Sequence, residues 1–189
     1  MFHIQINDEL FIRMLSGRDA KDLFQLTDAS RDYLKQWLPW VDATKEENDS
    51  MEFIQHSLKG FEKRISLTAG IFYKNQLVGV VGYNTLDSAN RIGTIGYWLG
   101  EQYQNKGIMT TAVKAMISYG FDHLQLNRIE IQCAKENQKS QHIPEKLGFT
   151  KEGCLKQSEW LYHRFVDHYL YRMLAEEWKK VSTEKSENC

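Results

Sequence analysis

Residues 96–110 read Gly96-Tyr97-Trp98-Leu99-Gly100-Glu101-Gln102-Tyr103-Gln104-Asn105-Lys106-Gly107-Ile108-Met109-Thr110. The run predicts a strand, a short loop and the start of a helix, because the apolar residues from Ile108 to Phe121 recur with helical periodicity. Free N–H groups and the positive dipole end at a helix N-terminus attract an anion, and Gly107 allows a close approach to the backbone. Lys106 adds a positive charge. The loop is therefore a candidate pyrophosphate site, the alternative being that Gly107 only shapes the turn.

Further strands and helices are predicted on both sides of this stretch. A strand over 10–15 ends at Ser16, which can cap a helix over 18–27, and helical character resumes over 29–37. Thr44 followed by Glu47 has the pattern of a capping box, which predicts a third helix ending near Lys63. Other strands are expected at 67–73, 77–83, 92–99, 128–133, 150–160 and 165–174, with a turn at 74–76 and a short helix after Asn137 that Gly148 closes. This order describes an α/β or α+β domain with a mixed sheet.

The composition indicates one folded domain. The chain has 189 residues, of which 42% are hydrophobic and 26% charged, and this usage argues against a wholly disordered chain. We expect a single domain over 1–174 and a polar, frayed or disordered tail over 175–189. No window approaches the ~18 apolar residues of a membrane-spanning helix, and residues 1–8 lack the pattern of a secretory signal. These features predict a cytoplasmic protein that does not bind membranes.

Charge and cysteine usage disfavour other classes. The net charge is -1, and the absence of a long basic run argues against nucleic-acid binding. Cys133, Cys154 and Cys189 are widely spaced, which favours reduced thiols over a disulfide framework or a zinc site, and we expect the first two in or near the core. The sequence contains no His-Glu-x-x-His pair and no Gly-x-Ser-x-Gly elbow, so neither a metal site nor an acyl-serine enzyme is predicted.

Three stretches, in order, resemble the GNAT superfamily of acyl-CoA N-acetyltransferases. The pyrophosphate loop of that family reads Gln or Arg, two residues, Gly, one residue, then Gly or Ala, and residues 104–109 match it with one departure, Met109. Residues 137–140 and 145–149 are similar to its later CoA-binding strand and helix, with Pro144 where many members carry a tyrosine general acid. That replacement, together with Ile108-Met109 and residues 153–159, resembles the RimJ/RimL-type ribosomal-protein N-acetyltransferase branch, and RimL most of all. The similarity spans about 11–174.

The resemblance implies a fold and a set of roles. The fold would be a mixed, mostly antiparallel sheet of about seven strands flanked by about four to five helices. The co-substrate would be acetyl-CoA, without a metal. A Ser at the Ser140 position would assist the departing CoA sulfur, and a Glu at the Glu159 position would deprotonate the amine. The residues implied in binding acetyl-CoA are Trp98, Leu99, Gln104, Asn105, Lys106, Gly107, Ile108, Met109, Thr110, Asn137 and Ser140.

Plainer readings stand beside these roles. Ser140 would serve only as a helix N-cap, Glu159 would be a solvated carboxylate, and Asn137 would be a turn residue instead of a partner of the pantetheine arm. Trp37 and Trp40 lie where related enzymes close over the acceptor, which makes them substrate-binding candidates beside Glu159, whereas ordinary packing is the alternative.

The implied reaction is a direct transfer of acetyl from acetyl-CoA to an amine. In the family, the strand over 96–99 splays from the strand over 129–133, so that a backbone N–H near Trp98 or Leu99 stabilises the oxyanion. The expected acceptor is the N-terminal α-amino group of a protein, with a ribosomal protein favoured, and a homodimer is implied only by the family. A small amine such as a polyamine, amino acid or antibiotic is the alternative acceptor, and a non-catalytic acyl-CoA sensor is the alternative class.

Overall fold

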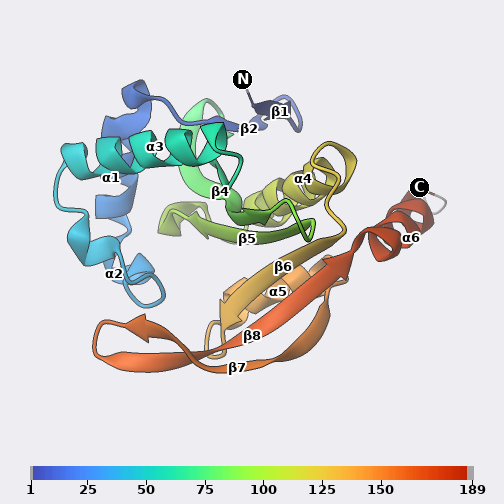
Figure 1. Ribbon diagram of the computed structural model, residues 1–189. Helices are drawn as coiled ribbons and strands as arrows, with labels where there is room; N and C mark the ends of the chain where they lie inside the picture. The colour runs from blue at the N-terminus through green and yellow to red at the C-terminus, as the bar shows by residue number, and fades with distance from the viewer. Residues whose placement is uncertain (1, 187–189) are drawn as a thin grey trace.

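A mixed eight-stranded sheet runs through residues 2–186, the part of the chain that the computed structural model describes (Figure 1). Its strands lie in the order β1-β2-β3-β4-β5-β6-β8-β7, and within it β5 and β6 pair in parallel while the other neighbours pair antiparallel. The strands are β1 His3–Gln5, β2 Leu10–Met14, β3 Leu67–Tyr73, β4 Gln76–Asp87, β5 Ile92–Leu99, β6 Arg128–Ala134, β7 Thr150–Leu161 and β8 Arg164–Leu174. The predicted mixed, mostly antiparallel sheet is confirmed, and the strand beyond the expected seven is the three-residue β1.

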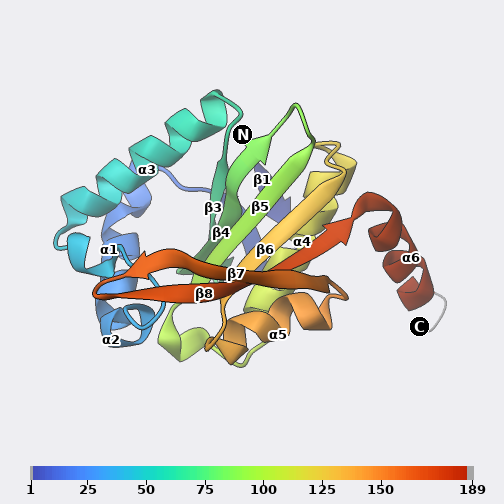
Figure 2. The ribbon, with the colours of Figure 1, turned by 60° about the horizontal axis from the view of Figure 1, so that its bottom comes forward.

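Helices cover both faces of this sheet. They are α1 Ala20–Ala29, α2 Arg31–Leu34, α3 Glu47–Glu62, α4 Ile108–Asp122, α5 Gln138–Lys146 and α6 Ala175–Ser186. On one face α1 contacts β4 and α3 contacts β3, while α4 contacts β2, β4 and β5, and α5 contacts β6. Figure 2 shows α4 behind β5 and β6. None of the described helices combines the length and apolar character that crossing a bilayer requires.

The central strand β4 is buried on both faces. Residues 77–83 are all buried, because α1 covers one side of the strand and α4 the other. A strand enclosed in this way needs a continuous apolar run rather than an alternating one. Tyr83 donates a 2.9 Å hydrogen bond to the Met116 carbonyl of α4, and a Cβ at Gly120 would lie 1.9 Å from the Tyr83 hydroxyl. Gly120 thus allows α4 to pack closely on β4.

Two local predictions need correction, one at the start of α3 and one at the hairpin between β3 and β4. The capping box at Thr44 and Glu47 is wrong, because Thr44 belongs to the preceding 3-10 turn and its carbonyl accepts a hydrogen bond from Arg31. The carboxylate of Asp49 caps α3 instead, accepting from the N–H groups of Lys45 and Glu46 at 2.7 and 3.0 Å. The predicted hairpin between β3 and β4 turns through 74–75 alone, both with positive φ, as two-residue hairpin turns require.

The C-terminal segment is ordered as helix α6 over Ala175–Ser186, so the expected frayed or disordered tail is wrong there. Trp178 is 6% exposed and lies 6.4 Å from the ring of Phe121, which anchors the polar helix to the core. Residues 187–189, including Cys189, lie outside the described residues. Cys133 is buried as expected, whereas Cys154 is exposed on the edge strand β7, contrary to the prediction.

Candidate active site

The strands β5 and β6 separate halfway along the sheet. They pair only from Ile92–Ile95 with Arg128–Ile131, and Figure 1 shows them diverging beyond that point. Two cavities of about 540 and 920 Å³ open at this divergence. They adjoin, because both are lined by Trp37, Leu38, Tyr97, Trp98, Asn137 and Ser140. A molecule in the first cavity could therefore meet a molecule in the second at the split between the strands.

The first cavity is bounded by the loop before α4 and by α5. Every residue predicted to bind acetyl-CoA lines it, namely Trp98, Leu99, Gln104, Asn105, Lys106, Gly107, Ile108, Met109, Thr110, Asn137 and Ser140. Gly107 has φ +74, and no atom lies within 4 Å of the position its Cβ would occupy. The first hydrogen bond within α4 runs from the Thr111 N–H to the Gly107 carbonyl. The N–H groups of residues 108–110 are therefore available to a ligand. Met109, the departure from the family's loop pattern, belongs to the buried hydrophobic core.

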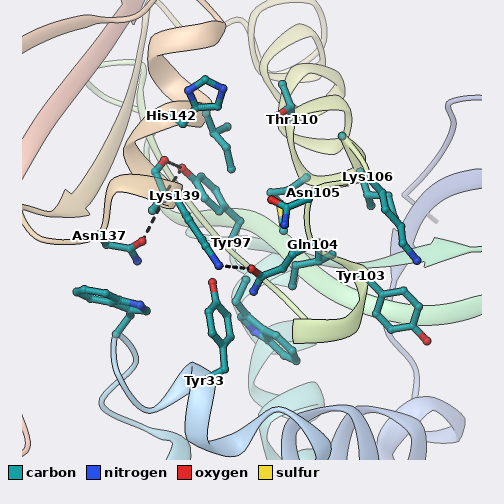
Figure 3. A pocket seen from close by; sticks show the side chains of 18 of the residues that line it. Tyr33, Tyr97, Tyr103, Gln104, Asn105, Lys106, Thr110, Asn137, Lys139 and His142 are labelled. Atoms are coloured by element: carbon teal, nitrogen blue, oxygen red, sulfur yellow. Dashed lines mark hydrogen bonds between the residues drawn. The ribbon is translucent and has the colours of Figure 1, made fainter.

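Positive charge dominates the first cavity. Lys106, Lys139 and Lys146 line it, and its described lining includes no Asp or Glu. The Lys139 Nζ donates to the Gln104 Oε1 at 2.9 Å and lies 5.3 Å from the centre of the Tyr33 ring. Figure 3 shows this contact joining α5 to the loop, with Tyr33 pointing toward it from α2. The cavity therefore offers free N–H groups and ammonium groups to a phosphorylated ligand.

The second cavity has the opposite charge. Asp49, Glu52 and Glu159 line it, and its described lining includes no Lys or Arg. The predicted substrate-binding residues Trp37 and Trp40 form part of its apolar wall, and the Trp40 and Trp98 rings lie 5.7 Å apart.

The Trp37–Trp40 segment is held from two directions. Tyr162, at the tip of the β7–β8 hairpin, donates to the Leu38 carbonyl at 2.8 Å, and Arg31 donates to the carbonyls of Val41 and Thr44. These hydrogen bonds tie the segment to the hairpin and the turn that follows it to α2.

Ser140 lies where the two cavities meet. Its Oγ is 3.3 Å from the Cys133 Sγ and 3.4 Å from the Tyr97 hydroxyl, which itself donates to the Ser140 carbonyl at 2.9 Å. The plain N-cap reading of Ser140 is wrong, because Asn137 caps α5 by accepting the Ser140 N–H at 3.1 Å. Burial raises the pKa of the Cys133 thiol and raises the pKa of Tyr97 well above its usual value, so both stay protonated at neutral pH.

Glu159 reaches the second cavity from the edge strand β7. Its Oε2 lies 3.1 Å from the Nε2 of His168, and its side chain is 29% exposed. A bulge precedes it, because Leu155 lies opposite His168 whereas Glu159 lies opposite Val166. The two candidate catalytic groups line the same cavity: Ser140 lies on α5 and Glu159 on β7.

The sequence did not identify Tyr97, Cys133 or His168 as site residues. Tyr97 stands inside the quoted stretch, and strand alternation places it on the same face as Ile95. The proximity of Cys133 to Ser140 depends on the turn between β6 and α5, and that of His168 to Glu159 depends on the bulge in β7. Among residues 2–186, no three His, Cys, Asp or Glu side chains gather closely enough to hold a metal.

Comparisons with known proteins bear on the chemistry of these cavities. The family described as the acetyltransferase (GNAT) domain matches residues 9–150. The Bacillus subtilis (strain 168) protein YdaF is 33% identical over 182 residues, covering 95% of this chain and 98% of that protein. The ribosomal-protein-serine acetyltransferase of Escherichia coli (strain K12) is 30% identical and covers 92% of this chain and 97% of that protein. The solved structure of RimL, a ribosomal L7/L12 α-N-protein acetyltransferase in complex with coenzyme A, has a TM-score of 0.89 at 26% identity, covering 93% of this chain and 99% of that one.

Proposed function

The chain belongs to the GNAT acetyltransferase family, and from that premise we propose that it transfers acetyl from acetyl-CoA to the N-terminal α-amino group of a protein. The observation that carries the proposal is the meeting of a cationic and an anionic cavity beside Ser140, where β5 and β6 diverge. Such a junction suits a reaction between a phosphorylated donor and an amine, which enter from opposite sides.

The first cavity suits acetyl-CoA. The N–H groups at the start of α4 and the open backbone at Gly107 fit a pyrophosphate, and Lys106 and Lys139 supply counter-charge. Asn137 and Ser140 lie at the inner end of the same cavity, where the thioester would reach the split in the sheet. The binding of coenzyme A by the RimL structure supports this assignment.

Lys139→Met is expected to raise the KM for acetyl-CoA about twofold to fivefold, because an exposed charge pair contributes about 0.2–1 kcal/mol. The effect should shrink as salt is added. Lys135→Met is the matched control, since Lys135 is also exposed but lines neither cavity. The measurement is the acetyl-CoA dependence of thiol release at low and high ionic strength. An equal change in both variants would remove Lys139 from the binding of the phosphates.

The oxyanion donor can be assigned from strand geometry. The Gly100 N–H donates to the Val78 carbonyl of β4 at 2.9 Å. Because successive N–H groups of an extended chain point to opposite edges, the Leu99 N–H points to the edge where β5 has left β6. We therefore assign the Leu99 N–H, rather than that of Trp98, to the developing oxyanion.

The remaining chemistry falls to Glu159 and Ser140. Glu159 takes the proton from the attacking amine, and the Ser140 hydroxyl donates a hydrogen bond to the CoA thiolate as the carbon–sulfur bond breaks. Direct attack fits the state of Cys133 better than an acyl-cysteine route does, because the thiol is buried and its pKa is raised.

The single carboxylate base favours an α-amino acceptor. An α-amino group with a pKa of about 8 is about 10% neutral at pH 7, whereas a lysine amine with a pKa of about 10.4 is less than about 0.1% neutral. The relatives named for ribosomal-protein acetylation point to the same acceptor class.

A cationic small amine such as a polyamine is the second candidate acceptor. The observation that favours it is the lining of the second cavity, which contains Asp49, Glu52 and Glu159 but no Lys or Arg among the residues described. One oxygen of Asp49 already accepts two backbone N–H groups at the start of α3, so a polyamine ammonium would share this carboxylate with the helix. We therefore rank the protein N-terminus first.

Thiol release from acetyl-CoA in the presence of an acceptor panel tests the proposal. The panel contains peptides with free N-terminal Ser, Ala or Thr, the same peptides N-blocked but carrying Lys, and polyamines. We expect turnover to be confined to the free N-termini. Turnover of polyamines would favour the second candidate, and coenzyme A binding without any turnover would favour an acyl-CoA sensor.

A further inference from the structure

We propose that His168 is a positioning residue that holds the carboxylate of Glu159 for proton transfer from the acceptor amine. The proposal rests on the proposed function, in which Glu159 is the base. It concerns the hydrogen bond between the His168 Nε2 and the Glu159 Oε2, which are 3.1 Å apart.

The backbone around Glu159 is shaped to make this contact. Between Leu155 and Glu159 the strand β7 advances four residues while β8 advances only from His168 to Val166. Gln157 has a positive φ of 51 within this bulge. Bulges of this kind re-aim side chains, often beside active sites. Because of the two extra residues in β7, Glu159 lies opposite Val166 and close to His168. In a regular register Glu159 would lie two residues farther from His168.

Asp167 fixes the bulge from the neighbouring strand. Its carboxylate accepts the Gln157 N–H at 3.0 Å and the Lys156 Nζ at 2.8 Å. The backbone of β8 at this point is anchored in turn, since the Lys135 N–H donates to the Asp167 carbonyl at 2.9 Å. Hydrogen bonds through Asp167 therefore hold the backbone on both strands next to Glu159 and His168.

The side chain of Glu159 depends on His168 for its orientation. Among the described residues, His168 supplies the only hydrogen bond to this carboxylate. An ionised carboxylate can only accept, so the His168 Nε2 carries the proton of the bond. A glutamate has several rotatable bonds, and without this donor its carboxylate would sample several positions in the cavity. A base is most effective when it is already placed for the reaction, and misplacement by about 1 Å can cost about 10²-fold.

Kinetics of His168→Ala and His168→Gln test the proposal. We expect His168→Ala to lower kcat about tenfold without changing the KM for acetyl-CoA, and His168→Gln to recover most of this loss, because its amide can donate from a similar position. His163→Ala is the matched control, since His163 is exposed at the hairpin tip and lines neither cavity. If His168→Ala does not fold, His168→Asn replaces it, because its amide is too short to reach Glu159.

A double variant separates positioning from packing. In a Glu159→Gln background, His168→Ala should cause no further loss of kcat, since its effect acts through the carboxylate. A loss as large as in the wild-type background would overturn the proposal, as would wild-type kcat in His168→Ala.

A readout that needs no acceptor keeps this inference separate from the proposed function. The imidazole ¹⁵N shifts of His168 should show the Nε2–H tautomer in the wild-type protein and a mixture of tautomers in Glu159→Ala. An unchanged tautomer pattern would refute the pairing even if the panel confirmed the acceptor. If only polyamines are turned over, the proposed protein acceptor is wrong. The kinetic comparison of the His168 variants is then made with a polyamine, and its result alone decides the role of His168.

Discussion

Glu159→Gln is expected to lower kcat by about 10²- to 10⁴-fold, the usual contribution of a positioned general base. The amide keeps the size of the side chain but cannot take a proton from the amine. The KM for acetyl-CoA should stay within about twofold, because Glu159 does not line the first cavity. The wild-type rate should fall at low pH for two reasons, because the base must be ionised and the acceptor amine must be neutral. In the variant only the contribution of the amine should remain.

The matched control for this change is Glu136→Gln. Glu136 is exposed on the loop before α5 and lines neither cavity. Thermal unfolding of both variants should match the wild-type protein, since Glu159 makes only one side-chain hydrogen bond among the described residues. A pH–rate profile with the same acid limb in Glu159→Gln would assign the base to another group.

Local patterns predicted the donor half of the site more fully than the acceptor half. The loop at 104–107 and the first turn of α4 are contiguous in sequence, so a single stretch of sequence predicted both the anion-binding N–H groups and the residues at which the site begins and ends. The acceptor half combines residues from distant segments, such as Trp40 before α3 and Glu159 on β7. The contact between Glu159 and His168 depends on a bulge that strand alternation cannot reveal. The resemblance named Glu159, but residue patterns alone did not place His168 beside it.

The errors in the fold have a similar origin. Helix α6 was predicted as a tail because its composition is polar, yet contacts outside the helix anchor it, among them the packing of Trp178 near Phe121 and the hydrogen bond from the Leu174 N–H to the Glu177 carboxylate. Thr44 had the right spacing for a cap, but the long-range hydrogen bond from Arg31 holds it in another turn. In both cases a tertiary contact overrode the local preference.

In the proposed reaction, the split in the sheet is also the boundary between the two oppositely charged cavities. Ammonium groups line one side and carboxylates the other, which under the proposal attracts acetyl-CoA to the first cavity and the amine to the second. Where β5 and β6 would otherwise pair, the Leu99 N–H is released to the junction. In the proposed mechanism, the same break in pairing makes room for the reactants and frees the Leu99 N–H for the oxyanion.

Ser140→Ala is expected to lower kcat about 10- to 100-fold while leaving acetyl-CoA affinity within about twofold, because a hydroxyl facing a developing thiolate acts mainly in the transition state. The substitution should not disturb α5. The Ser140 hydrogen bonds to Asn137 and Tyr97 that fix this turn use its backbone N–H and carbonyl, which alanine retains. Single-turnover rates and calorimetric coenzyme A binding provide the two measurements.

Ser158 provides the control for Ser140→Ala, and Tyr97 is the alternative donor to the sulfur. Ser158→Ala, on the exposed bulge outside both cavities, should behave as the wild-type protein. A loss of coenzyme A affinity equal to the loss of kcat would show that Ser140 binds the cofactor rather than assisting departure of the sulfur. An unchanged kcat would instead point to Tyr97, whose hydroxyl lies 3.4 Å from the Ser140 Oγ and is protonated at neutral pH because burial raises its pKa. Tyr97→Phe would then be expected to show the kinetic loss predicted for Ser140→Ala.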